Sequence, residues 1–511
     1  MRILQIDMEE VHEVSLVKYD ILGLKNIEII KDCCEYANIP YPKAHKVNFE
    51  DDNVWDDMVK SPYGIFQFES EYSNDLLKKF NPHKINDMNL VNASLRPSGE
   101  SYRDRLLSGE INKNPSEIID ELLSENNGYL VFQEDTIAFL QNICGLSGSE
   151  ADNIRRAIGR KQKDRLEKAM PDILEGYCSM SNKERSVAEE EAKVFLKIIE
   201  DSSSYQFGKN HSTGYSMIGY YCAMLRYYYP LEFTTSYLNN AKNDEDLING
   251  ENLAKLKNIK IKQPKFRYSR ADYFMDKETN SIYKGISSIK YLNTQVGELL
   301  YSLRDNQYNS FVDLLIDINK KINRRQMEIL IKLDYFSEFG KSSKLMQVYE
   351  LFNNIYGKKQ LRKDKYPHLN EYFSRHCTTE TAAMYKFDDT IELLKDIIKD
   401  IPNENINIAK RVMAWKEYVG SCSLIDKRNP RDCVVTDVDL KYTPRVEMYC
   451  LGSGNTQWVK ISKRIWKNNK LQKGDLVNLC EVHKKHKRKK VGDKWVELED
   501  FELWTDEYFV K

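Results

Sequence analysis

The stretch "GYLVFQEDTIAFLQNICGLSGSEADNIRRAIGRKQKDR", residues 128–165, decides how the first half of the chain is interpreted. It begins like a short strand and turns into a helix near Gln133, where apolar residues take up helical spacing. Ser147 followed three residues later by Glu150 is a capping box, which predicts the start of a second helix. We therefore expect a strand that leads into two helices, of which the second is basic.

The basic helix carries four cations within two turns, Arg155, Arg156, Arg160 and Lys161. Arg156 and Arg160 are i, i+4 and share a face, and Asp152 lies one turn earlier, where it can pair with Arg156. A solvated charged face is the common fate of such a run. The alternative is an anion clamp, because paired guanidiniums grip phosphate oxygens with a fixed fork. Both interpretations stay open on these residues alone.

A second polar cluster lies in "FGKNHSTGY", residues 207–215. Lys209, Asn210 and His211 stand in a row at the start of a helical pattern rich in tyrosine. A lone histidine at such a place is usually structural. The free N–H groups and the dipole of a helix N-terminus favour anions, however, so this cluster also predicts a phosphate or base site.

Carboxylates follow several of the predicted strands. In "SLVKYDILGLKN", residues 15–26, Lys18 and Asp20 are two apart and share one strand face. Asp20 is therefore either a chemical group or the partner of Lys18 in an ion pair. The carboxylates of "FQFES" (66–70) and "QED" (133–135) could bind a metal, but a structural hydrogen-bonding role is favoured for both.

Composition excludes several classes of protein. The chain has 511 residues and a formal net charge of −1, so any nucleic-acid binding must come from local clusters of charge. None of the ten cysteines falls in a CxxC pair, which argues against a zinc site or a disulfide framework and favours a reducing cytosol. The N-terminus does not read as a signal peptide, and no apolar run is long enough to span a membrane. We expect a cytoplasmic protein that makes no membrane contact.

The pattern changes at about residue 431. Five short alternating segments, "DCVVTDVDL", "RVEMYCLG", "TQWVKIS", "DLVNLCEVHKK" and "KWVELEDFELW", predict a small β-barrel. The run "HKKHKRKK", residues 483–490, lies between two of the predicted strands and reads as a loop. It is either a solubilising loop or, as in other small barrels, a path for single-stranded nucleic acid. The candidate DNA-binding residues are Lys484, Lys485, Lys487 and Arg488.

The order of these motifs resembles that of the bacterial C-family replicative DNA polymerases, the alpha subunits of DNA polymerase III. The motifs that carry the resemblance are "LVKYDILGL" (16–24), "YGIFQFES" (63–70), "NASLRPSGE" (92–100), the segment 129–161 and "YQFGKNHSTGYSMIGYYCAMLRYYYPLEF" (205–233). A weaker likeness in "YKGISSIKYLNTQVGELL" (283–300) suggests the tandem helix-hairpin-helix segment of the family.

The resemblance implies a multidomain α+β fold. Its expected parts are a partial palm (1–60), the remaining palm with thumb and fingers (61–240), outer fingers with a helix-hairpin-helix-like segment (241–345), a helical connector (346–430) and a barrel of the oligonucleotide-binding (OB) type (431–511). The turn "IKYLN" lacks the glycines that would let backbone N–H groups meet a DNA phosphate, which weakens the case for duplex binding there.

The resemblance also implies DNA-directed DNA polymerase activity on primer-template DNA and dNTPs. By motif matching, Asp20 is one of three catalytic carboxylates that hold two Mg²⁺ ions. Residues matched to the nucleotide site are Lys18, Arg155, Arg156, Lys209, Asn210 and His211. One carboxylate cannot hold two Mg²⁺ ions, and the family's Asp-x-Asp pair is not found before Asp20. We therefore expect a chain that is inactive alone. It is either a truncated copy or, as we favour, part of a split polymerase of a phage or of an interrupted gene, completed by an amino-terminal polymerase fragment.

Two other functions stay open. The chain could be a DNA-binding module without catalysis, or a module that contacts the replisome and its sliding clamp. "QVYELF", residues 347–352, loosely resembles a clamp-binding peptide through Gln347, Leu351 and Phe352. A core helix is the commoner reading of such a match. Retention of Asp20 and Lys18 on one strand face favours the enzyme half over the other two.

Overall fold

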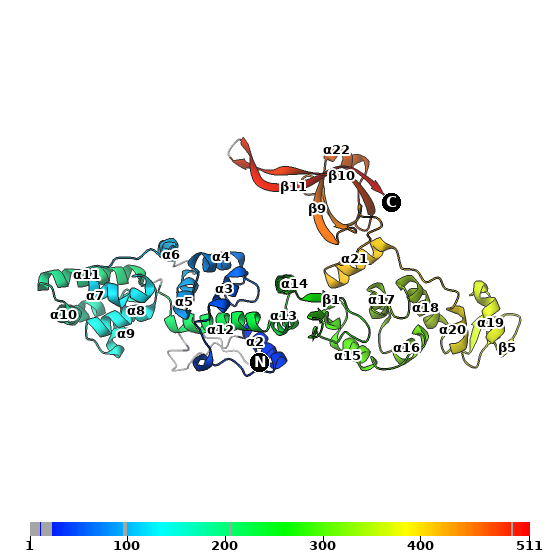
Figure 1. The fold of residues 1–511 in the computed structure, drawn as a ribbon, viewed down its shortest axis with the longest axis horizontal. Helices are drawn as coiled ribbons and strands as arrows, with labels where there is room; N and C mark the ends of the chain where they lie inside the picture. The colour runs from blue at the N-terminus through cyan, green and yellow to red at the C-terminus, as the bar shows by residue number, and fades with distance from the viewer. Residues whose placement is uncertain (1–10, 12–22, 96–99, 204–205, 492–493) are drawn as a thin grey trace. The chain divides into compact units, whose positions relative to one another are not determined.

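The computed structural model describes residue 11 and residues 23–95, 100–203, 206–491 and 494–511. The chain divides into two compact units, Met1–Lys260 and Ile261–Lys511 (Figure 1). In the described part of the chain, no helix has both the length and the apolar character needed to cross a bilayer. The strand expected around Lys18 and Asp20 lies outside the described residues.

Helices build the described part of the first unit. They are α2 (Lys25–Ala37), η1 (Ala44–Lys46), α3 (Asp52–Lys60), α4 (Glu71–Phe80), α5 (Ile85–Ser94), α6 (Glu100–Leu107), α7 (Glu117–Leu122), η3 (Ser124–Asn126), α8 (Gln133–Ala138), η4 (Phe139–Ile143), α9 (Gly148–Gly159), α10 (Lys163–Met180), α11 (Arg185–Ser202), α12 (Lys209–Tyr228), α13 (Pro230–Asn239) and α14 (Asp244–Leu256). Helix α12 packs against α2, α3, α5 and α13 and forms the centre of the unit. The helix pair expected in 133–161 and its capping box at Ser147 are confirmed.

Residues 63–70 differ from the strand that their alternation predicts. They form turns, in which Gln67 takes a left-handed backbone conformation with φ of 71°. That conformation breaks the extended backbone that a strand needs. Ile65 and Phe68 are nevertheless buried in the core beside α3 and α12, so the apolar side chains find the core without a sheet.

A buried charge cluster fastens α12 to α3. The guanidinium of Arg226 is fully buried, and its Nε donates to Asp57 Oδ2 at 3.0 Å. Its Nη1 donates to the backbone oxygens of Ser61 and Tyr63, and Lys257 Nζ pairs with Asp57 Oδ1 at 2.5 Å. Burial lowers the pKa of Arg226, while Asp57 opposes that shift. Removal of one partner would leave a buried charge unpaired, so this cluster fixes the relation of the two helices.

Helices α7 to α11 form a lobe with its own core. Apolar side chains of α7, α9, α10 and α11 surround Phe139 and Phe195, whose rings meet edge-on at 4.7 Å. The segment that forms α8 to α11 begins just after Val131 and ends just before Phe207, and its two ends meet. There, Phe207 N donates to Val131 O at 3.1 Å and Gln133 N donates to Phe207 O at 2.9 Å. The strand expected before Gln133 is thus reduced to one parallel bridge.

The second unit combines helices with three sheets. Its elements are β1 (Lys260–Lys262), β2 (Phe274–Asp276), β3 (Ser281–Tyr283), η5 (Ile286–Ser288), α15 (Thr294–Ser302), α16 (Phe311–Asp317), α17 (Arg324–Lys332), α18 (Ser342–Ile355), β4 (Gln360–Arg362), η6 (Pro367–Leu369), α19 (Asn370–His376), β5 (Thr379–Glu380), β6 (Met384–Lys386), α20 (Ile391–Ile397), α21 (Ile408–Val419), β7 (Asp432–Asp439), β8 (Arg445–Cys450), β9 (Asn455–Ile461), α22 (Lys463–Asn468), β10 (Leu476–Val491) and β11 (Lys494–Val510). The segment 346–430, expected to be helical, also contains the small sheet β4-β6-β5.

The turn before α15 places an aromatic residue where its backbone conformation suits glycine. Tyr291 has φ of 71°, in the left-handed region that L side chains rarely adopt. The Arg325 guanidinium lies 3.4 Å from the centroid of its ring, and Gln326 Nε2 donates to its carbonyl oxygen at 3.3 Å. Lys290 N donates to Tyr418 O at 2.8 Å. Contacts from α17 and α21 therefore hold this turn. The bond to Tyr418 uses the N–H of Lys290, which in a glycine turn would be available to a DNA phosphate.

All five C-terminal strands are confirmed. They pair in the order β10-β11-β9-β8-β7, and β10 pairs with β7 through Leu476 and Val434, which closes the sheet. β9 and β11 are parallel, and the other neighbours are antiparallel. Val435, Val446, Met448 and other apolar side chains fill the interior.

Candidate nucleotide site

The first turn of α8, Gln133–Asp135, joins the two basic clusters that the sequence singled out. Its three side chains each bind a different segment, and the partners lie on α9, at the start of α12 and in the chain before α8. The structural hydrogen-bonding role favoured for these residues is confirmed. Their joining role could not be seen in the sequence, because the partners of Gln133 and Glu134 are 22 and 75 residues away.

Arg155 and Arg156 share one carboxylate. Arg155 donates to Asp152 Oδ1 from Nε at 3.0 Å and from Nη2 at 2.8 Å, and its Nη1 donates to Gln133 Oε1 at 3.0 Å. Arg156 Nη2 lies 2.8 Å from Asp152 Oδ2, so the pair expected from the i, i+4 spacing is confirmed. The hydrogen bond from Arg155, followed by that from Arg156, lowers the pKa of Asp152, which stays ionised between the two arginines.

Lys209 begins α12, and a carboxylate lies at this helix terminus. Lys209 N donates to Glu134 Oε2 at 2.8 Å, which satisfies one of the free N–H groups that favour anions. Lys209 Nζ lies 3.6 Å from Glu125 Oε2 and 5.7 Å from the centroid of the Phe132 ring. The anion that binds this N–H group of the helix terminus is thus the carboxylate of Glu134, from the chain itself.

Asn210 and His211 are exposed on the first turn of α12. The His211 ring lies between Phe207 and Tyr215, at centroid distances of 5.4 and 4.2 Å. Tyr215 in turn packs on Phe66 at 5.1 Å. These four rings therefore form a contiguous row of aromatic contacts at the start of α12, in which His211 is exposed.

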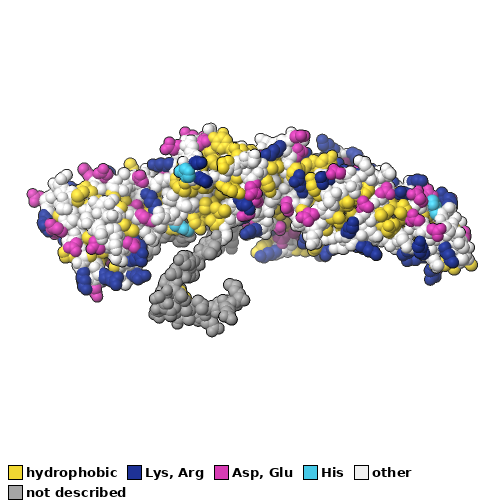
Figure 2. All heavy atoms as spheres, turned by 90° about the horizontal axis from the view of Figure 1, so that it is seen from below, with side chains coloured by type: hydrophobic (Ala, Val, Ile, Leu, Met, Phe, Trp, Pro, Cys, Tyr) yellow, Lys and Arg dark blue, Asp and Glu magenta, His cyan; other side chains and the backbone are white. Residues whose placement is uncertain are grey.

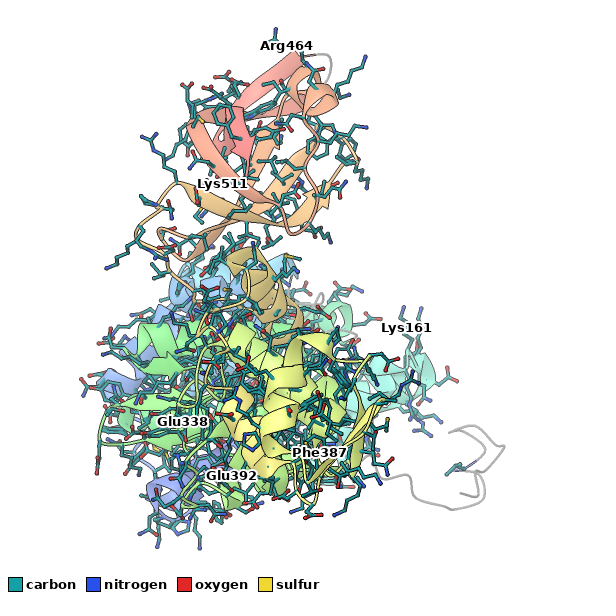
Figure 3. All side chains as sticks on the ribbon, turned by 90° about the vertical axis from the view of Figure 1, so that its right-hand side faces the viewer. Lys161, Glu338, Phe387, Glu392, Arg464 and Lys511 are labelled. Carbon is teal, nitrogen blue, oxygen red and sulfur yellow. The ribbon has the colours of Figure 1, made fainter. Side chains whose placement is uncertain are left out.

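The end of α9 and the start of α10 carry further exposed cations. Arg160 closes α9, Lys161 takes a left-handed conformation in the turn, and Lys163, Arg165 and Lys168 follow on α10. Lys161 points outward from this turn (Figure 3). Figure 2 shows Lys and Arg side chains gathered over this part of the lobe. This cluster is the solvated basic face that the commoner interpretation expects, whereas Arg155 turns inward to the polar turn.

No metal centre is formed by the described side chains. Asp20 lies outside the described residues, and among those described no three His, Cys, Asp or Glu side chains gather as ligands. Asp135 Oδ2 accepts from Phe132 N at 2.8 Å, from Val131 N at 3.2 Å and from Asn126 Nδ2 at 2.9 Å. Burial raises the pKa of Asp135 to about 6, although these hydrogen bonds and Lys209 oppose the shift. Asp135 therefore stabilises the start of α8 through these hydrogen bonds.

The basic run 483–490 is part of strand β10, so its assignment as a loop is wrong. β10 pairs with β11 along this run except at Lys487, where the register shifts, and this pairing extends the hairpin beyond the closed part of the sheet. Lys487 Nζ lies 3.1 Å from Asp500, and Lys485 Nζ lies 4.4 Å from the Trp504 ring centroid. Lys484 is exposed and has no ion pair with any described residue. The side chain of Arg488 lies outside the described part of the chain.

The clamp-like residues lie on α18. Phe352 is buried in the core of the second unit and stacks on Tyr356 at 4.4 Å, and Leu351 packs against the same core. Gln347 is exposed and its Nε2 donates to Ser343 O at 3.4 Å, within the helix. This arrangement is that of a core helix. In the folded chain the Phe352 side chain is not accessible to a clamp.

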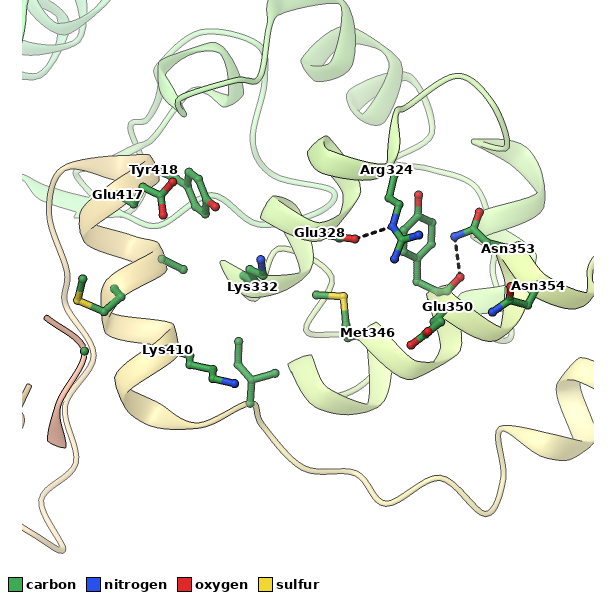
Figure 4. Close-up of a pocket in the computed structure, with 15 residues that line it drawn as sticks. Arg324, Glu328, Lys332, Met346, Glu350, Asn353, Asn354, Lys410, Glu417 and Tyr418 are labelled. Carbon is green, nitrogen blue, oxygen red and sulfur yellow. Dashed lines mark hydrogen bonds and ion pairs between the residues drawn. The ribbon is translucent and has the colours of Figure 1, made fainter. Parts of the chain in front are cut away.

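A cleft of about 650 Å³ lies between α17, α18 and α21 (Figure 4). Lys332 and Lys410 point into it, and Arg324 pairs with Glu328 at 2.8 Å on its wall. Its acids, Glu328, Glu350 and Glu417, equal its cations in number. The cleft therefore has no charge preference that would select a phosphate ligand.

Comparison with known proteins identifies the family. The model of the bacterial DNA polymerase III alpha subunit finger domain matches residues 26–181, and a helix-hairpin-helix model matches residues 258–346. The DNA polymerase III subunit alpha of Ureaplasma parvum serovar 3 is 28% identical over 444 residues, which cover 80% of this chain and 45% of that protein.

Two further relatives carry the same name. That of Aquifex aeolicus is 31% identical over 363 residues, covering 66% of this chain and 30% of the relative. That of Campylobacter jejuni is 29% identical over 367 residues, covering 69% and 30%. The chain thus spans less than half the length of these curated relatives. From the finger match, the helix-hairpin-helix match and these relatives, we conclude that the chain belongs to the family of bacterial DNA polymerase III alpha subunits.

Proposed function

We propose that this chain supplies the triphosphate-binding fingers of a bacterial replicative DNA polymerase. The observation that carries the proposal is the convergence of Arg155 on α9 and Lys209 on α12 at the turn Gln133–Asp135. Arginine forks and a helix N-terminus are both suited to phosphate oxygens. In this proposal, Arg155, Arg156 and Lys209 bind the triphosphate of the incoming dNTP, and Asn210 and His211 lie beside it.

The proposed reaction is attack of the primer 3′ hydroxyl on the α-phosphate of the dNTP. Two Mg²⁺ ions, when bound, would hold the attacking and leaving oxygens. Asp20 would be one of their ligands, and carboxylates of an amino-terminal polymerase fragment would supply the others. Lys18 would contact the triphosphate. The cationic side chains would neutralise the charge of the departing pyrophosphate.

The five C-terminal strands support assignment to the OB type. Their order, with a parallel pair β9 and β11 and with α22 between β9 and β10, is that of a five-stranded Greek-key barrel. We propose that the extended β10–β11 hairpin contacts single-stranded DNA through Lys484, Lys485, Lys487 and Arg488. Asp500 on β11 pairs with Lys487 and partly offsets this charge, so contact would depend on the cations that lack acidic partners.

The test is primer extension by this chain mixed with an amino-terminal polymerase III alpha fragment that carries the palm. Asp20→Ala should lower kcat by more than about a hundredfold, because a metal ligand is lost. Arg155→Gln should mainly raise the KM for dNTP, by about tenfold, because a charge-assisted bond to the triphosphate is lost.

The matched control is Glu189→Gln on α11, which removes an acid from an exposed arginine pair in the same lobe. It should leave both constants unchanged. If the mixture extends primers equally well with Asp20→Ala, the catalytic assignment is wrong. If the mixture binds primer-template but never extends it, the chain is a DNA-binding module.

A further inference from the structure

Arg155 and Arg156 are neighbours in the sequence but are held very differently. The Arg155 side chain is 20% exposed and the Arg156 side chain 59% exposed. Arg155 donates two N–H groups to Asp152 and one to Gln133. A guanidinium has five N–H groups, so Arg155 retains two, one on each terminal nitrogen. Arg156 donates a single N–H, to Asp152. One arginine is therefore fixed and the other retains most of its freedom.

Resting on the proposed function, we propose that Asp152 and Gln133 are positioning residues that set Arg155 in its phosphate-binding orientation. One N–H group remains on each terminal nitrogen of Arg155, and an arginine can use both of these nitrogens to bind two phosphate oxygens. Because three bonds already fix the guanidinium, little side-chain entropy is lost when the triphosphate binds. Arg156 adds charge but no fixed geometry.

Gln133 also sets Arg155 relative to α12. Its backbone N–H donates to Phe207 O at 2.9 Å, and its Nε2 donates to Gln206 O at 3.2 Å. The next residue, Glu134, accepts from Lys209 N. Consecutive residues thus hold a cation of the lobe and the first N–H of α12. A loss of the Gln133 amide would free Arg155 from α12 without removing any charge from the site.

The experiment measures binding of Mg²⁺-dTTP to the full chain, with Gln133→Met and Asp152→Asn tested in the wild-type and Arg155→Gln backgrounds. Methionine keeps the length of glutamine but cannot accept the Arg155 hydrogen bond. Each variant should weaken dTTP binding about fivefold in the wild-type background, by loss of an ordering hydrogen bond. Gln133→Met should not weaken it further when Arg155 is already glutamine, because the orientation that Gln133 sets no longer matters. Asp152→Asn should weaken it less in that background than in the wild type, because only the pair with Arg156 is then lost.

The control is Glu189→Gln, and the midpoint of thermal unfolding is followed for every variant. Equal losses in both backgrounds would mean that Gln133 and Asp152 act only through the fold, and would overturn the inference. The inference would also be overturned if Gln133→Met and Asp152→Asn bind dTTP as wild type does while Arg155→Gln binds it weakly. If the wild-type chain does not bind dTTP, or if Arg155→Gln binds as wild type does, the proposed function fails at this site instead. If Gln133→Met unfolds, Asp152→Asn still tests the inference, because Asp152 is partly exposed on α9.

Discussion

The three neighbouring polar side chains of Gln133–Asp135, in the first turn of α8, each bind a different part of the chain. Gln133 and Glu134 bind groups on α9 and α12, whereas Asp135 accepts from the N–H groups of Val131 and Phe132, just before α8, and from Asn126. Its carboxylate is buried and its pKa is raised to about 6, so the ionised form is the less favoured one in the folded chain. The stability of the first unit should therefore respond to this one proton.

The expected pH dependence follows from the direction of the shift. The folded state binds the Asp135 proton more tightly than the unfolded state does, so stability falls as pH rises from about 4 to about 6. The difference in free energy of unfolding between wild type and Asp135→Asn should change by about 3 kcal/mol over that range. Asparagine can accept the same three N–H groups and does not titrate.

Urea unfolding at pH 4.5 and pH 7, followed for both proteins, checks this expectation. The lowered pKa values of exposed acids such as Asp152 act in the opposite direction, but they are common to both chains and cancel in the difference. A difference that is the same at both pH values would show that Asp135 is not a buried titrating acid.

At the scale of elements, strands β7 and β8 bring two thiols together. Cys433 and Cys450 are cross-strand partners with Sγ atoms 3.2 Å apart. Leu451 N donates to Asp432 O at 2.9 Å, so the adjacent cysteine pair is a non-hydrogen-bonded one, in which Cα atoms approach to about 4.5 Å. That spacing is within the range of disulfides. The hydrogen bond from Cys433 lowers the pKa of Cys450 to about 7.

Treatment of the folded chain with diamide should join these two cysteines. Each thiol gives up one hydrogen to the azo group of the oxidant and the two sulfurs form a bond, so the protein loses two thiols and 2 Da. Closure of this loop should stabilise the barrel by about 3 kcal/mol. Peptide mapping and thermal unfolding measure both effects. Cys450→Ser should abolish the link and the shift, and a disulfide that maps elsewhere would contradict the assignment.

Elements were predicted unevenly. The capping box at Ser147 and the five C-terminal strands follow from local signals, and they are found where expected. Residues 63–70 alternate like a strand but turn at Gln67, because their apolar side chains pack on helices and not on a neighbouring strand. The run 483–490 reads as a loop because of its charge, yet β11 pairs with all of it except Lys487. In both segments, contacts with residues distant in the sequence determine the secondary structure.

The candidate site was predicted only in part as well. The sequence selected Arg155, Arg156 and Lys209 through the family resemblance, and the Asp152 pair through helical spacing. It gave no sign that Gln133 would bind Arg155 or that Glu134 would cap α12, since these contacts depend on how the lobe folds back. Spacing rules reach one or two turns, and the contacts that join the two clusters lie beyond that reach.

Over the whole molecule, charge is balanced overall and separated locally. The net charge is −1, yet β10 carries a basic run opposite the acidic residues of β11. Lys487 has an acidic partner, Asp500, whereas Lys484 has none among the described residues. Binding of single-stranded DNA to the barrel should therefore depend on the unpaired cations more than on the count of lysines.

Lys484→Gln should lower the slope of log K against log salt for an oligo(dT) ligand by about 0.7, the value for one phosphate contact on a single strand. Lys487→Gln is the matched control on the same strand and should change the slope less, because Asp500 already neutralises Lys487. Fluorescence anisotropy across a salt series measures both. Equal slopes in wild type and Lys484→Gln would remove this hairpin from the DNA path.

The bridge between Phe132 and Phe207 has a consequence for how this family can change in length. The residues from Gln133 to Gln206, which form α8 to α11, begin and end at one point, where two backbone hydrogen bonds join the flanking chain. Insertions or deletions in α10 or α11 alter the size of this excursion but leave the spacing of its ends untouched. The segment α8 to α11 can thus be lengthened or shortened, provided that the bridge, Gln133 and the core that this segment shares with α7 are retained.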